Sequence, residues 1–206
     1  VTITGGSFVN IEQATGGSAG DFIRGNASNN TLTGGPGSDT LIGFAGADAF
    51  RFGNVVALEK DFIADSIQSD LKDDVLDFLP LTTSGISLDL SKPIADPANP
   101  NPGEPLLLIP HANRSIKMFN STVFNIFNVR GTALADTITG NSGNNILIGG
   151  AGADSLTGNA GSDSLVGDAG IDTLVGGEGS DTLVGGADND TYRFAAAAAA
   201  QTDRIN

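Results

Sequence analysis

Residues 149–184 read GGAGADSLT, GNAGSDSLV, GDAGIDTLV and GGEGSDTLV in steps of nine, and this stretch decides the fold. Each unit begins with Gly, carries Asp at its sixth position and carries Leu at its eighth position. The same spacing runs from 131 to 193 as seven units, and four earlier units run from 16 to 51. Because three registers are kept together over eleven units, the chain contains a true internal repeat.

Each unit divides into a six-residue turn and a three-residue strand. Glycines at positions one, two and four permit positive φ, so several carbonyl oxygens can point to one spot beside the Asp at position six. The apolar eighth residue faces the interior, and positions seven and nine face outward. Two units form one coil, so each turn is expected to lie against the turn that comes two units later. The repeat predicts an all-β fold, a right-handed parallel β-roll or β-solenoid, with two nonapeptide arrays and an intervening β-rich insertion.

The chain is expected to contain two related modules. The sequence from 10 to 39 matches that from 125 to 154 at a constant offset, and the gap between the arrays is not a multiple of nine. Because the sequence starts at Val1 inside an apparent strand, we interpret it as part of a longer protein. The expected segments are 1–52, a lead-in strand and the first array; 53–130, the insertion; 131–194, the second array; and 195–206, a tail or connector to a next module.

The insertion is less regular than the arrays. Ile63, Ile67 and Leu71 have helical spacing, which predicts a short helix. The stretch 93–105 contains five prolines and is expected to be a loop. Strands are predicted within 87–90, 106–109 and 116–129.

The composition limits the classes of partner. The chain has 24 acidic and 10 basic residues, a net charge of −14, and no Cys. Such a charge argues against nucleic acid and anionic lipid as partners, and the absence of Cys excludes disulfides and thiolate zinc sites. No run of about 18 apolar residues predicts a membrane span. Composition alone is typical of a soluble acidic surface, but aspartates at a fixed spacing favour a hard cation with oxygen ligands, such as calcium.

The nonapeptide Gly-Gly-x-Gly-x-Asp-x-apolar-x resembles the repeat of the RTX, or hemolysin-type, family, and its clearest copies begin at Gly34, Gly149 and Gly176. The resemblance implies a calcium-binding β-roll in which each ion lies between one turn and the turn two units later. Carried onto this sequence, the implied pairs are Asp21/Asp39, Asn30/Asp48, Asp136/Asp154, Asn145/Asp163, Asp154/Asp172, Asp163/Asp181 and Asp172/Asp190.

Glycines of the turns complete the implied ligand set, for about five to seven Ca²⁺ ions. Asn30 and Asn145 are neutral donors, so their sites are expected to be weaker or empty. Position four is not Gly in the turns that begin at 16, 25, 131 and 185, so sites at the array ends are expected to be weaker. The implied glycines are Gly149, Gly150, Gly152, Gly158, Gly161, Gly167, Gly170, Gly176, Gly177 and Gly179.

No catalytic centre is predicted. Residues 16–20 match the Gly-x-Ser-x-Gly nucleophile elbow, but an elbow needs a strand-to-helix turn, and here a strand is expected to follow. His111 is the single His of the chain and has no His-Glu-x-x-His motif around it.

Two functions remain open. The first is a calcium-rigidified segment of a bacterial cell-surface structural protein, such as a surface layer, fibril or adhesin, whose further partners are copies of itself or other surface proteins. The second is an accessory module of a type I-secreted enzyme or toxin. In both, the chain is expected to fold on meeting calcium outside the cell. A third possibility is that the insertion binds a ligand such as a sugar, but no set of residues there supports it.

Overall fold

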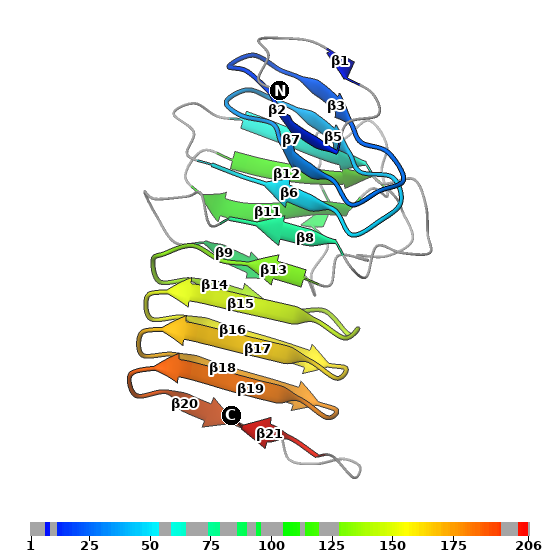
Figure 1. Cartoon of the computed structure of the whole chain (residues 1–206). Helices are drawn as coiled ribbons and strands as arrows, with labels where there is room; N and C mark the ends of the chain where they lie inside the picture. Colours follow the sequence, from blue (N-terminus) through cyan, green and yellow to red (C-terminus); the bar gives the residue numbers. More distant parts are fainter. Residues whose placement is uncertain are drawn as a thin grey trace.

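The structure is a computed structural model in which residues 7–8, 12–53, 59–64, 74–78, 86–89, 94–95, 105–111, 114–119, 128–194 and 202–205 are described. Within these ranges the chain consists of strands and turns, and most neighbouring strands are parallel. The described residues contain no helix that could cross a membrane. The molecule is a parallel β-roll, as the repeat predicted, with the coils stacked between the two ends of the chain (Figure 1).

One face of the roll is a single sheet of nine strands that runs through both arrays. Figure 1 shows it continuing from the blue first array to the orange second array. In spatial order its strands are β2 (Gln13–Thr15), β4 (Thr31–Thr33), β6 (Ala49–Arg51), β8 (Val75–Asp77), β13 (Asn128–Arg130), β15 (Ile146–Ala151), β17 (Ser164–Ala169), β19 (Thr182–Ala187) and β21 (Arg204–Ile205).

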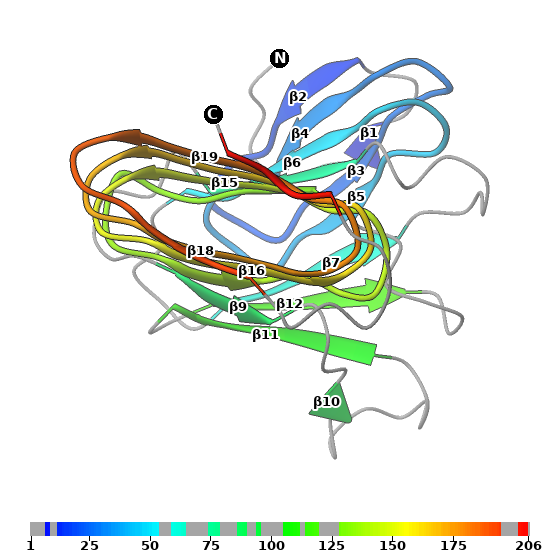
Figure 2. The same ribbon diagram turned by 90° about the horizontal axis from the view of Figure 1, so that it is seen from below.

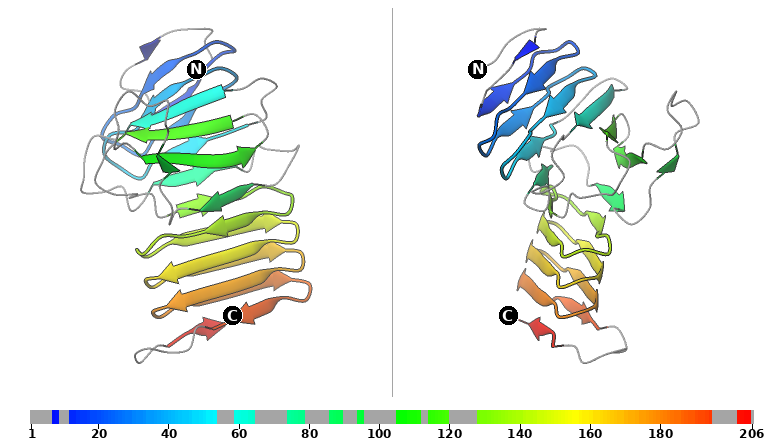
Figure 3. Two further views of the ribbon diagram at one scale, coloured as in Figure 1. Left: turned by 180° about the vertical axis from the view of Figure 1, so that it is seen from behind. Right: turned by 90° about the vertical axis from the view of Figure 1, so that its right-hand side faces the viewer.

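The opposite face is divided between two sheets, one for each array (Figure 3). The seven-stranded sheet contains β1 (Ser7–Phe8), β3 (Phe22–Arg24), β5 (Thr40–Ile42), β7 (Glu59–Ala64), β12 (Arg114–Phe119), β11 (Pro105–His111) and β10 (Ile94–Ala95). The five-stranded sheet contains β20 (Thr191–Arg193), β18 (Thr173–Glu178), β16 (Ser155–Ala160), β14 (Thr137–Thr139) and β9 (Ser87–Asp89).

The register within each array is the predicted step of two units. Leu147 pairs with Leu165, and Leu156 pairs with Leu174, each two units later in the chain. Viewed along the stack, the coils of the second array lie over one another (Figure 2). Turns of one side are therefore direct neighbours in space, which is what a shared site between turns requires.

The eighth residues of the units form the core. They lie in columns between the two faces, and all of those in β3 to β6 and β14 to β19 are fully buried. Along the nine-stranded sheet the column contains Ala14, Leu32, Phe50, Leu76, Val129, Leu147, Leu165 and Leu183. The columns behind the other two sheets contain Ile23, Leu41 and Ile63, and Ile138, Leu156 and Leu174.

The insertion joins the roll instead of leaving it. β8 pairs with β6 on one side and with β13 on the other, although Phe50, Leu76 and Val129 are not spaced by nine residues. Phe52 and Phe78 stack at 5.2 Å between ring centroids and fill the core where the two arrays meet. The nine-stranded sheet is continuous because the insertion supplies two strands whose middle residues, Leu76 and Val129, are buried apolar side chains in the core column.

Three expectations about local structure differ from the result. The stretch 93–105, expected to be a loop, contains β10 and ends on the first residue of β11. Ile63 lies in strand β7, so the helical reading of Ile63, Ile67 and Leu71 is wrong at its first residue, because pairing with β5 overrides the local spacing; the other two residues lie outside the described ranges. The strands predicted within 87–90 and 106–109 are β9 and β11. In the second array the strands from β15 to β19 have six residues, since the first half of each turn also pairs with its neighbour.

Candidate metal site

The position-six side chains form a ladder along each edge of the roll. In every pair that the sequence implied, the backbone N–H of the earlier residue donates to Oδ1 of the later aspartate. The N···O distance is 2.8 Å from Asp154 to Asp172 and 2.9 Å from Asp163 to Asp181. All seven pairs are thus brought together: Asp21/Asp39, Asn30/Asp48, Asp136/Asp154, Asn145/Asp163, Asp154/Asp172, Asp163/Asp181 and Asp172/Asp190.

The second carboxylate oxygen, Oδ2, lies over the first glycine of its own turn. A Cβ added to Gly158 would collide with Oδ2 of Asp163 and would lie 2.5 Å from the carbonyl oxygen of Gly176 in the next turn on that side. The same arrangement surrounds Gly167, with Oδ2 of Asp172 and the carbonyl of Gly185. Position one therefore needs Gly because oxygen atoms of two turns converge on it.

In the second array, the Oδ2 atoms of Asp154, Asp163, Asp172 and Asp181 have no hydrogen-bond donor, and these residues are all at most 2 % exposed. A buried carboxylate oxygen without a donor is unfavourable by itself, since desolvation of a charge is costly. Carboxylate and carbonyl oxygens facing one another without a proton fit the ligand chemistry of calcium, which takes oxygen donors from both kinds of group.

Asp190 ends the second array, where the sequence predicted a weaker site, and it is less enclosed than the other rungs of the ladder. Its Oδ1 accepts from Asp172 N–H at 3.0 Å, but its side chain is partly exposed, whereas those of Asp163 and Asp172 are buried. The hydroxyl of Tyr192 enters the same turn and accepts from Gly185 N–H at 3.0 Å. The physical reason is position, because β20, which follows Asp190, is the edge strand of its sheet. Asp190 therefore lacks the enclosure that the central turns give their carboxylates.

Burial changes the protonation of this ladder. Removal from water raises the pKa of Asp154 to about 7 and that of Asp163 to about 6, against the lowering effect of the backbone N–H groups of Asp136 and Asn145. Burial also raises the pKa of Asp136, Asp172 and Asp181. Without a cation the ladder therefore resists full ionisation.

The ligand set depends on main-chain oxygens as much as on side chains. Among the described ranges, no three acidic or His side chains gather at one point. Stacked turns place only the carboxylates of neighbouring rungs together, so carbonyl oxygens such as that of Gly176 must complete any coordination shell.

Glycine has two separate tasks in these turns. In the turns that begin at 149, 158, 167 and 176, positions two and four take positive φ, with Gly177 at +111° and Gly179 at +125°. Glycine was expected to permit positive φ at position one as well, but none of the described position-one glycines takes it. Position one needs Gly because of the close approach of oxygens described above.

Three further aspartates extend the ladder outside the nonapeptide register. Asp61 Oδ1 accepts from Asp39 N–H at 3.1 Å, and Asp74 Oδ1 accepts from Asp48 N–H at 2.8 Å. Asp203 Oδ1 does the same for Asp181 at 3.1 Å. Sequence reasoning missed them because their spacing is not two units, but each begins an Asp-x-apolar triplet like positions six to eight of a unit.

In the two asparagine turns, the position-six amide forms a hydrogen bond within its own turn. Asn30 Nδ2 donates to Asn26 Oδ1, and Asn145 Nδ2 donates to Asn141 Oδ1, both at 3.3 Å. An amide hydrogen thus lies where an aspartate would offer only acceptors, and the weaker calcium sites expected at these two turns stay a prediction.

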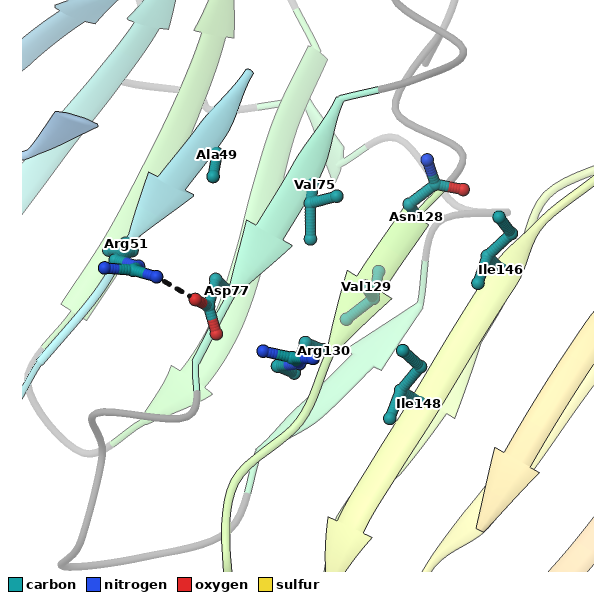
Figure 4. A pocket seen from close by; sticks show the side chains of 9 residues that line it. All are labelled: Ala49, Arg51, Val75, Asp77, Asn128, Val129, Arg130, Ile146 and Ile148. Atoms are coloured by element: carbon teal, nitrogen blue, oxygen red, sulfur yellow. Dashed lines mark hydrogen bonds and ion pairs between the residues drawn. The ribbon is translucent and has the colours of Figure 1, made fainter. Parts of the chain in front are cut away.

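Two features could suggest an enzyme: the nucleophile-elbow match at residues 16–20 and a hollow at the surface. Residues 16–20 form a turn that enters strand β3, so the nucleophile-elbow geometry is not present there. A hollow of about 270 Å³ lies outside the nine-stranded sheet, where Arg51 and Asp77 form an ion pair of 3.0 Å (Figure 4). No Ser, Cys or His lines this hollow; its lining is Ala49, Arg51, Val75, Asp77, Asn128, Val129, Arg130, Ile146 and Ile148.

Comparison with known protein families agrees with the geometry. The family described as RTX calcium-binding nonapeptide repeat (4 copies) matches residues 15–53, 130–165 and 157–192. The matched ranges cover both arrays and leave the insertion out. A search of curated proteins finds no match.

Proposed function

Because this chain belongs to the family of proteins with RTX calcium-binding nonapeptide repeats, we propose that it is a calcium-binding segment of a larger secreted or cell-surface structural protein of a bacterium. A surface layer, fibril or adhesin would use such a segment as a rigid spacer that folds on binding extracellular calcium. The observation that carries the proposal is the row of buried, donor-free Oδ2 atoms at Asp154, Asp163, Asp172 and Asp181.

The residues that would hold the ions are the carboxylates with donor-free Oδ2 atoms, Asp154, Asp163, Asp172 and Asp181, together with the turn carbonyls. Asp163 and Asp172, with the carbonyl oxygens of Gly176 and Gly185, offer the oxygens that converge on Gly158 and Gly167. Calcium would supply the positive charge that this set of acceptors lacks. The backbone N–H bonds to Oδ1 hold each carboxylate in place, so the turn presents Oδ2 in a fixed direction.

Folding and binding are expected to be one event. Adjacent unneutralised carboxylates at about 4 Å repel by about 1 kcal/mol in water and by about 4 kcal/mol at an effective dielectric constant near 20. The chain has a net charge of −14 and 29 glycines. Charge repulsion and lost chain entropy therefore both oppose its folding. Since the sites do not exist in the unfolded chain, the free energy of calcium binding contributes directly to folding.

Circular dichroism of the chain with and without a calcium chelator tests the proposal. We expect the β signal to appear with millimolar calcium and to be largely lost after chelation. Magnesium at the same concentration is the control, because it demands a tighter octahedral shell and dehydrates reluctantly. An unchanged spectrum after strong chelation would rule out the coupling of folding to calcium.

The structural role is favoured over the second candidate, an accessory module of a type I-secreted enzyme or toxin, by the continuity of the nine-stranded sheet. β8 and β13 connect the two arrays into one stack of strands, so the insertion continues the β-roll and does not end it. The coding sequence on both sides of this chain decides between the two. A protease or lipase signature next to the roll would favour the accessory role, and further arrays would favour the structural one.

A further inference from the structure

Eight of the eleven turns of the arrays fall into two kinds, which differ in what faces the position-six side chain. In the first kind, the backbone N–H at position two donates to the position-six oxygen of the same turn. Gly17 and Thr132 donate to Oδ2 of Asp21 and Asp136 at 2.6 Å. Asn26 and Asn141 donate to the amide oxygens of Asn30 and Asn145 at 3.0 Å. We call these the self-capped turns: 16–21, 25–30, 131–136 and 140–145.

In the second kind, the backbone at position two takes positive φ, and no hydrogen-bond donor reaches Oδ2 of the position-six aspartate. Gly150, Asn159, Asp168 and Gly177 all have positive φ, between +75° and +113°. Asn and Asp tolerate this region better than other residues with a side chain. The Oδ2 atoms of the same turns have no hydrogen-bond donor. We call these the donor-free turns: 149–154, 158–163, 167–172 and 176–181.

Thr132 makes the first turn of the second array the most strongly capped. Besides its N–H, its hydroxyl lies 3.1 Å from Oδ1 and 3.2 Å from Oδ2 of Asp136. A β-branched residue also disfavours positive φ, so this turn is held in the capped state. An N–H that donates to Oδ2 uses one of its lone pairs and offsets part of its negative charge, so this oxygen is a weaker ligand for a cation.

The order along the chain is the same in both arrays. Each array begins with two self-capped turns, which together form one complete coil. In the second array, the next four turns are donor-free. A coil that completes its own hydrogen bonds offers a stacking surface to the coils that do not.

We propose that the first coil of each array is independent of calcium and serves as the template on which the calcium-dependent coils assemble; this rests on the proposed function of the roll as a calcium-folded segment. The tight ions belong to the donor-free turns, and the self-capped turns contribute no tight ion of their own. Thr132 and the pairs Asn26/Asn30 and Asn141/Asn145 are the residues that set this boundary.

Isothermal titration of the full chain with calcium, in a competing chelator, tests the proposal by counting tight ions. Asp163→Asn alters a donor-free turn and should remove at least one tight ion from the stoichiometry. Asp136→Asn is the matched change in a self-capped turn and should leave the number unchanged. Loss of the same number of tight ions from both variants would overturn the proposal while leaving calcium binding itself intact. A wild-type chain that binds no calcium would instead refute the proposed function.

A second pair of variants keeps every carboxylate and decides the matter if Asp163→Asn fails to fold. Thr132→Gly removes the hydroxyl and frees φ, so the turn can adopt the donor-free state and should gain one tight ion. Thr132→Val removes the hydroxyl but keeps β-branching and the N–H, and should show the wild-type number. Equal stoichiometry for the Gly and Val variants would contradict the assignment of Thr132.

Discussion

The second array and the insertion build neighbouring parts of one sheet by different rules. In the array, each strand from β14 to β18 pairs with the strand two units later, and the buried residue is almost always Leu. In the insertion, Leu76 of β8 lies between Phe50 and Val129, at unequal distances along the chain. The comparison shows that stacking requires a strand with an inward apolar residue, whereas the nine-residue spacing is required by the turns.

The two regions also differ in what fills the core and closes the edges. In the second array, one column of Leu and Ile side chains fills each side of the core. Where the insertion enters, Phe52 and Phe78 stack and take up the additional space. At the edges, Asp61 and Asp74 take the place that a position-six residue has in the array.

The largest effect is expected from removing a core leucine in either region. Leu165→Ala in the array and Leu76→Ala in the insertion both empty a site that is 0 % exposed. Each should lower the free energy of unfolding in saturating calcium by about 2–5 kcal/mol, through lost burial and the cavity that remains. Urea unfolding followed by circular dichroism gives the two values.

Similar losses would show that the insertion is an integral part of the roll. If Leu76→Ala costs less than about 1 kcal/mol, a figure typical of surface positions, the insertion does not share the core. Thr182→Ala, at an outward-facing position of β19, is the control and should change stability little.

An intermediate effect is expected from the aspartate ladder. Asp163→Ala leaves the N–H of Asn145 without its acceptor and removes the carboxylate from a donor-free turn. The unsatisfied buried N–H alone costs about 1–3 kcal/mol, and the calcium midpoint of folding should rise as well. Asn145→Ala removes a neutral amide and should have a much smaller effect on the calcium midpoint.

Asp74→Ala carries this test into the insertion, because Asp74 accepts from Asp48 N–H as Asp163 accepts from Asn145 N–H. We expect a stability loss of about 1–3 kcal/mol here too. Calcium titrations followed by circular dichroism compare the three variants. Equal calcium midpoints for Asp163→Ala and Asn145→Ala would contradict the pairing of turns.

The periodic part of the molecule could be predicted from the sequence because its constraints are local and repeated. Gly at position one, Asp at position six and Leu at position eight each indicate one contact of the repeat, and the repetition fixes their register. All seven implied pairs are joined by a hydrogen bond for that reason, although the last of them ends on the partly exposed Asp190. The pairing partners of β8 and β13 could not be predicted, because they depend on where a chain of irregular length returns to the sheet.

The sequence indicates the self-capped state of the first turns of each array only in part. Ala19, Ser28 and Leu134 replace Gly at position four in three of the four self-capped turns, and this predicted weaker sites. Asp188 breaks the same rule but still takes positive φ, at +76°. Position two is the better indicator, yet Gly17 is compatible with both states, so the N–H contact to Asp21 had to come from the structure.

The smallest effect, and the one confined to the array, is expected from pH in the absence of calcium. Burial raises the pKa of Asp154 to about 7 and that of Asp163 to about 6, above the ordinary value of 3.8. The folded, metal-free state therefore binds more protons than the unfolded chain between about pH 4 and 7, and its stability falls as pH rises through that window. The chelated chain should gain β signal when the pH is lowered from about 7.5 to about 5, whereas calcium affinity should fall over the same range because protons and calcium compete for the carboxylates. Asp154→Asn, which carries no charge at any pH, should weaken the pH dependence of the chelated chain. A spectrum that loses β structure on acidification would show that burial does not govern these carboxylates.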